Sequence, residues 1–179
     1  MLSTLTQKAS RFVKRLFKKE TTPQKIGLSF VELIIKSREP KRETSGTLSA
    51  LPEKDRERVQ LETMLLQGFV IEYVTAELFR DRPERLNILN AYYAMLDGLA
   101  KQDPVWRSFD NELRKRTELY SQAVIAPSLD ALLTRVGDAF ADACGDAGNT
   151  IFSIIGIIEF EMQYVATCKL CIEYVGAFG

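Results

Sequence analysis

Histidine is absent from all 179 residues of the chain. This absence excludes catalytic triads that use histidine, haem and zinc sites with histidine ligands, and the Glu-x-x-His motif of di-iron helical bundles. Cysteine is scarce, and its odd count of three gives no disulfide framework. The sequence therefore predicts a protein of a reducing compartment, the cytoplasm by default, with no recognisable enzyme motif.

The remaining candidates for metal ligands are two cysteines and a ridge of acidic residues. Cys168 and Cys171 stand one turn apart, late in an apolar segment and far from a helix N-terminus that would stabilise a thiolate. Asp138, Asp142 and Asp146 recur every four residues, a spacing that could hold Mg²⁺, but no second acidic motif accompanies them. We expect structural cysteines and a solvated acidic helix face, with no metal and no cofactor.

The formal net charge of zero hides an asymmetry along the chain. Residues 1–42 contain eleven Lys and Arg against three Glu, whereas residues 123–179 contain two basic and seven acidic residues. Such a basic head and acidic tail indicate either that the two ends pair with each other or that a basic arm binds an anionic partner.

Apolar residues recur at helical spacing through most of the chain. Between the periodic segments, Asp103 with Pro104 and Ser128 have the character of helix starts. This pattern predicts an all-α, single-domain bundle of five to seven helices around an apolar C-terminal helix. The expected helices cover residues 3–19, about 22–36, 52–79, 83–101, about 104–126, about 128–143 and about 150–178. Within this bundle we expect three parts: a basic amphipathic helical arm over 1–36, a flexible linker over 37–51, and a body over 52–179.

The C-terminal segment from residue 150 has two competing periods. Phe160, Met162 and Tyr164 alternate with polar residues as in a strand, but the segment runs far longer than ordinary strands without a turn signal. The length of the segment favours one helix, and a strand within the segment remains the alternative. A membrane span is disfavoured because Glu159 and Glu161 lie mid-segment, each costing about 2.5–3.5 kcal/mol on insertion.

The strongest functional signal is the stretch KASRFVKRLFKK, residues 8–19, which carries six basic residues and no acidic one. On a helical wheel its apolar residues fall within an arc of about 140°, opposite the cations. The residues predicted to contact a partner or membrane are Lys8, Arg11, Phe12, Lys14, Arg15, Leu16, Phe17, Lys18 and Lys19.

Three interpretations of this stretch remain open. It has the form of an interfacial membrane helix, of a targeting presequence, and of an ordinary first helix that docks on the body or on a partner. Specific nucleic-acid binding is not expected, because Phe12 and Phe17 point away from the cations and could not stack on bases beside them.

These patterns favour a non-enzymatic interaction or adaptor protein that docks on an anionic membrane surface or a partner protein through its N-terminal helix. It would be cytoplasmic and peripheral at a membrane, and self-association is left open. The alternative is a helical sensor or small enzyme with a pocket between the later helices. That pocket would hold Glu161, predicted to be a buried acid, together with Tyr92, Tyr93 and Trp106.

Overall fold

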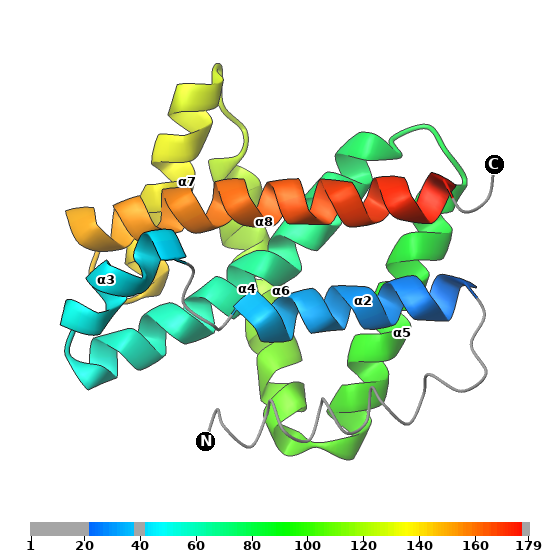
Figure 1. Cartoon of the computed structure of the whole chain (residues 1–179), viewed down its shortest axis with the longest axis horizontal. Helices are drawn as coiled ribbons and strands as arrows, with labels where there is room; N and C mark the ends of the chain where they lie inside the picture. Colours follow the sequence, from blue (N-terminus) through cyan, green and yellow to red (C-terminus); the bar gives the residue numbers. More distant parts are fainter. Residues whose placement is uncertain (1–21, 38–41, 177–179) are drawn as a thin grey trace.

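The computed structural model describes residues 22–37 and 42–176. Over these residues the chain is an all-α bundle of seven helices with an apolar C-terminal helix, as the sequence predicts (Figure 1). The helices are α2 (Thr22–Ser37), α3 (Arg42–Ala50), α4 (Glu53–Leu78), α5 (Glu84–Gln102), α6 (Pro104–Ala123), α7 (Leu129–Ala143) and α8 (Thr150–Gly176). The helix expected over residues 3–19 lies outside the described residues.

Two helix starts follow the predicted capping signals, and a third has a cap that was not predicted. The side chain of Asp103 accepts a hydrogen bond from the amide of Val105 at 2.9 Å, with Pro104 in the first position of α6. Ser128 caps α7 through the amide of Ala131 at 3.2 Å. Asn149 caps α8 in the same way, and the loop before it contains two glycines with positive φ.

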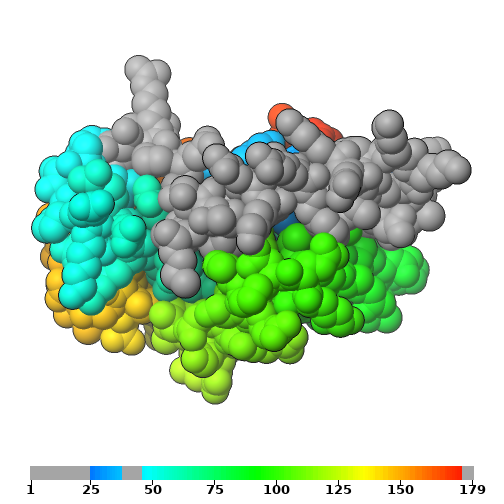
Figure 2. Space-filling view, turned by 90° about the horizontal axis from the view of Figure 1, so that it is seen from below, coloured from blue at the N-terminus to red at the C-terminus, as the bar shows by residue number. Residues whose placement is uncertain are grey.

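The helix α4 packs against five others and forms much of the core. It contacts α2, α5, α6, α7 and α8, and it runs diagonally behind α8 and α2 in Figure 1. Thirteen of its residues are buried, including the continuous run from Glu62 to Ile71. The helices α5 and α6 make up much of the face shown in Figure 2.

The helix α2 belongs to the core, which corrects the predicted division of the chain at residue 36. It packs mainly on α5 and α4, and its buried side chains include Leu28, Phe30 and Ile34. The ring of Phe30 meets Tyr92 edge-on, with centroids 5.9 Å apart. Residues 22–36 are therefore part of the body, and only residues 1–21 remain as a candidate arm.

The predicted linker over 37–51 is also wrong for most of its length. Residues Arg42–Ala50 form α3, which contacts α8 and buries Leu48. Ser37 ends α2 in a buried position, where its hydroxyl donates to the carbonyl of Ile34 at 2.7 Å. The prediction rested on Pro40, Gly46 and a lack of apolar residues. One buried leucine and contact with α8 are enough to place a short helix there, because tertiary packing stabilises helices of weak propensity.

The C-terminal segment is one helix, so length gave the correct choice over strand periodicity. It crosses α7 at very close range: a Cβ built on Gly156 would lie 2.5 Å from the Cβ of Phe140, and one on Gly137 would lie 2.7 Å from the carbonyl oxygen of Ser153. Glycine at both positions lets the two helix axes approach. This crossing fixes which faces of α8 are buried and which are exposed.

Candidate functional site

The basic residues predicted to bind a partner, Lys8 to Lys19, lie outside the described residues. Their positive charge contrasts with the net negative charge of the rest of the protein. Because the chain holds 24 basic and 24 acidic residues, and residues 8–19 hold six of the basic ones, the remainder has 18 basic and 24 acidic residues. That remainder carries a formal net charge of −6, so the positive charge available for an anionic surface is concentrated in one short stretch.

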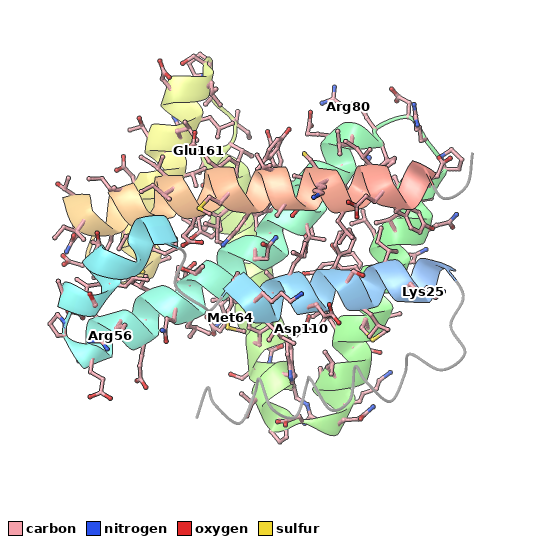
Figure 3. All side chains as sticks on the ribbon, in the orientation of Figure 1. Lys25, Arg56, Met64, Arg80, Asp110 and Glu161 are labelled. Atoms are coloured by element: carbon pink, nitrogen blue, oxygen red, sulfur yellow. The ribbon has the colours of Figure 1, made fainter. Side chains whose placement is uncertain are left out.

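The four residues of the predicted pocket do not share one environment. Tyr92 and Trp106 are core side chains, and Trp106 packs edge-on against Phe109 with ring centroids 5.3 Å apart. Tyr93 is 42% exposed on α5. Glu161 is exposed on α8, at the upper edge of that helix in Figure 3. The prediction that Glu161 is buried is therefore wrong.

The error arises because α8 turns polar residues toward the core. Glu159, Gln163 and Thr167 are all buried on the face that meets α4. The side-chain amide of Gln163 donates to the backbone carbonyl of Thr63 at 3.1 Å, and that of Gln67 donates to the hydroxyl of Thr167 at 3.1 Å. These hydrogen bonds offset part of the desolvation of the buried polar groups, so the polar face can be the inner one.

The opposite face of α8 presents aliphatic side chains to the solvent. This surface, called the α8 stripe below, comprises Ile151 (48% exposed), Ile154 (50%), Val165 (67%) and Ile172 (64%). Ile158 and Cys168 lie half-buried along it, and Glu161 interrupts it. The helical wheel correctly grouped Glu161 with apolar neighbours but could not tell that this face points outward.

A buried carboxylate that the sequence analysis missed is Glu62 on α4. Its two oxygens accept hydrogen bonds from Nε of Arg116 at 2.9 and 3.1 Å, and one of them also accepts from the hydroxyl of Tyr120 at 2.8 Å. Desolvation raises the pKa of Glu62, against the opposing effect of the guanidinium. Arg116 also donates to the carbonyl of Ala143 at the end of α7. The cluster ties α4, α6 and α7 together.

A second missed acid is Glu72, between α4, α5 and α6. Burial raises the pKa of its carboxyl to about 7, while the Tyr93 hydroxyl and the Arg114 guanidinium act in the opposite direction. Arg114 itself pairs with Asp110 at 3.3 Å. Both missed acids sit inside apolar runs of the sequence, and their partners lie far along the chain, so spacing alone gives no signal for them.

The cysteines and the acidic ridge differ in their exposure to solvent. Cys144 and Cys171 are buried, and burial raises the pKa of their thiols, to about 12 and about 11. Asp138, Asp142 and Asp146 are all exposed, as a solvated face requires. Within residues 22–37 and 42–176, no group of three His, Cys, Asp or Glu side chains is placed to hold a metal ion.

One stretch of the described chain, Thr150–Tyr174 in α8, is long and apolar enough to cross a membrane by length and composition. Buried helices of soluble proteins meet the same criterion. The apolar character of α8 thus fits either a packed helix or a helix at a membrane surface.

No family model, no curated protein and no solved structure matches the chain. The charge, burial and contacts of its residues are therefore the basis for a function.

Proposed function

We propose that this is a non-enzymatic, helical interaction protein that docks on an anionic membrane surface through residues 8–19. The observation that carries the proposal is the segregation of charge: six cations and no acid in twelve residues, joined to a remainder of net charge −6. A body with that charge is repelled by an anionic surface, so attraction has to come from the basic stretch.

The magnitudes favour a peripheral and reversible attachment. Each Lys or Arg near an anionic leaflet contributes about 1 kcal/mol, so the six together supply about 6 kcal/mol at low salt. Phe12, Leu16 and Phe17 lie on the opposite arc of the helix and add about 1.5–3 kcal/mol each when fully buried in lipid. Salt screens the first contribution and leaves the second.

The described helices supply the folded body to which this segment is attached. Their apolar side chains form one hydrophobic core that reaches from Ile26 in α2 to Tyr174 in α8. Because α2 begins at Thr22, a basic helix ending at Lys19 would join the body through only two residues. A membrane-bound segment would therefore hold the body close to the surface. The alternative pocket function requires a buried Glu161, and this residue is exposed.

The proposal is tested by reversing charge in the segment and, separately, on the body. The variant with Lys14, Arg15, Lys18 and Lys19 all changed to Glu takes residues 8–19 from +6 to −2. Losing four cations removes about 4 kcal/mol, which is about a thousandfold in binding to vesicles containing phosphatidylserine. Sedimentation with these vesicles should leave the variant in the supernatant.

The matched control reverses four exposed basic residues of the body, namely Lys54, Arg82, Lys101 and Lys169. It makes the same change in net charge, so it reproduces general repulsion without altering the segment. We expect the control to lose far less binding than the segment variant. Equal losses in the two variants would contradict a docking role for residues 8–19.

A second variant separates insertion from Coulomb attraction. Changing Phe12 and Leu16 to Ser keeps every charge and removes apolar side chains, so binding should weaken by about 3–6 kcal/mol at full burial. The salt dependence of the remaining binding should match that of the wild type. Binding that is unaffected by these changes would mean that the segment attaches by charge alone.

A further inference from the structure

We propose that the α8 stripe is a self-association surface: it pairs with the α8 stripe of a second copy of this chain, with the two helices antiparallel and Val165 at the two-fold axis. The inference does not depend on the proposed membrane function. It starts from the exposed face of α8, which has aliphatic residues where a solvent-facing helix normally has polar ones. Val165 and Ile172 are 67% and 64% exposed, whereas Gln163 on the buried face is 2% exposed.

The spacing of residues on this face is that of a coiled-coil seam. From residue 151 to residue 172 the positions recur at alternating intervals of three and four, and all of them are exposed or half-buried: Ile151, Ile154, Ile158, Glu161, Val165, Cys168 and Ile172. Heptad spacing of this kind lets one helix pack lengthwise against another. The spacing therefore indicates that the partner surface is a helix that runs along most of α8.

The exposed face of α8 is self-complementary about Val165. Ile158 and Ile172 lie seven residues to either side of it. Glu161 and Lys169 lie four residues to either side. When two antiparallel helices meet at Val165, each residue is level with the residue at the same distance on the other side. Ile158 of one copy is then level with Ile172 of the second, and Glu161 is level with Lys169.

Glu161 and Lys169 are both available to form these cross-copy pairs. Both are exposed, and Figure 3 shows Glu161 at the edge of α8 that faces away from α2. The ion pairs between described residues involve neither of them. Antiparallel pairing forms the contact twice, once on each side of the two-fold axis. Parallel pairing in register would instead set each charge against its own copy, so the charges favour the antiparallel arrangement.

The rest of the bundle leaves this side of α8 open. The contact with α7 runs through Gly156 and that with α4 through Gln163. At 3.6 residues per turn, these two positions lie about 180° and about 160° around the helix from Val165. In Figure 1, α4 accordingly lies behind α8. A lipid surface on the stripe would desolvate Glu161 without a cation at a matching position, whereas a second copy supplies Lys169. The described residues therefore favour a second copy as the occupant.

The first test measures the mass of the full-length chain by analytical ultracentrifugation without lipid. A single helix pair is a small interface, so we expect a reversible dimer with a Kd of about 100 µM. A chain that is still monomeric at about 500 µM, well above that Kd, would overturn the inference. Thermal melts at about 5 µM, where the monomer predominates, check that each variant below folds as the wild type does.

Exchanging the two charges tests the antiparallel pairing. Glu161→Lys and Lys169→Glu each replace two attractive contacts with two repulsive ones, so each should weaken the dimer about tenfold. The chain carrying both changes should recover the wild-type Kd, and an equal mixture of the two single variants should form a heterodimer. Single variants as dimeric as the wild type, or a double variant no better than the single ones, would overturn the pairing.

The matched controls for net charge are Glu57→Lys and Lys54→Glu. Both residues are exposed on α4, and their substitution makes the same changes in net charge as the two single variants on α8. The Kd of each control should stay within about twofold of the wild type, because exposed charges far from an interface contribute little to it. Control variants that weaken the dimer as much as Glu161→Lys and Lys169→Glu would contradict a specific contact at α8.

A cysteine at the two-fold axis reports the register directly. Val165→Cys brings two thiols opposite each other, so oxidation with copper phenanthroline should link the two copies. Ile172→Cys is the matched control: it is almost equally exposed, but the two copies of residue 172 lie about 21 Å apart in this register. Both variants carry Cys168→Ser, which removes the half-buried native thiol. Linkage through Ile172→Cys as fast as through Val165→Cys would overturn the proposed register.

Discussion

Replacing Arg116 with Met would test the energetics of the best-defined polar cluster in the core. The change leaves the carboxyl of Glu62 with the Tyr120 hydroxyl as its remaining hydrogen-bond donor among the contacts described above. The Glu62 side chain is only 3% exposed, so water cannot replace the guanidinium. Removing one partner of a buried ion pair costs about 3–5 kcal/mol. For a chain of this size that lowers the melting temperature by about 6–20 °C at pH 7.

The pH dependence of this loss identifies its cause. Burial already raises the pKa of Glu62 in the folded protein, and removing the guanidinium raises the pKa further. A carboxyl with a raised folded pKa costs no stability while it is protonated in both states, and it costs more as pH rises from the unfolded value toward the folded one. The difference between wild type and Arg116→Met should thus be smallest near pH 4 and widen toward pH 7.

The assay is thermal melting of both proteins from pH 4 to pH 8, with two further variants. Glu62→Gln combined with Arg116→Met removes the buried charge and should recover most of the loss at pH 7. Glu62→Gln alone should cost less than Arg116→Met, because Arg116 is 24% exposed and can still reach water. A loss that does not change with pH, or a double variant no more stable than Arg116→Met, would refute the reasoning.

Three other outcomes follow from burial and pKa. Glu161→Gln and Glu161→Lys should both melt within about 0.5 kcal/mol of wild type, because Glu161 is exposed; a much larger loss for Lys would show that it is buried. By circular dichroism, a chain without residues 1–20 should melt cooperatively, whereas one without residues 1–35 should not, since each buried side chain of α2 contributes about 1.5–3 kcal/mol. Equal melts would contradict this. Because burial raises the pKa of Glu72 from 4.5 to about 7, ionisation of Glu72 lowers the free energy of unfolding by up to about 3 kcal/mol as pH rises between these values. Glu72→Gln should therefore flatten the melting profile in this pH range, and an unchanged profile would contradict the raised pKa.

The sequence predicted the helices well where local signals were strong. Asp103 with Pro104, and Ser128, mark helix starts through contacts within a few residues, and both act as caps in the structure. The length of the C-terminal segment likewise decided between helix and strand. These features depend on residues that are close together in the sequence, so the sequence alone is enough to predict them.

Features that depend on distant residues were not predictable in this way. Glu161 was predicted to be a buried acid. The crossing of α7 at Gly156 and the hydrogen bond of Gln163 to α4 instead turn Glu159 inward and Glu161 outward. The helix α3 was missed because its stability comes from contact with α8. The hydrogen bond from Gln163 to Thr63 and the contact of α3 with α8 join residues that are about 100 or more positions apart, and periodicity carries no information about such partners.

The central claim is that residues 8–19 attach the protein to an anionic surface. The most direct measurement is sedimentation of the wild-type chain with phosphatidylserine vesicles and with neutral phosphatidylcholine vesicles, at about 20 mM and about 500 mM salt, where the Debye length falls from about 20 Å to about 4 Å. We predict that the protein sediments with the anionic vesicles at low salt, much less at high salt, and little with the neutral ones. Wild-type protein that stays in the supernatant with anionic vesicles at low salt would contradict the proposal.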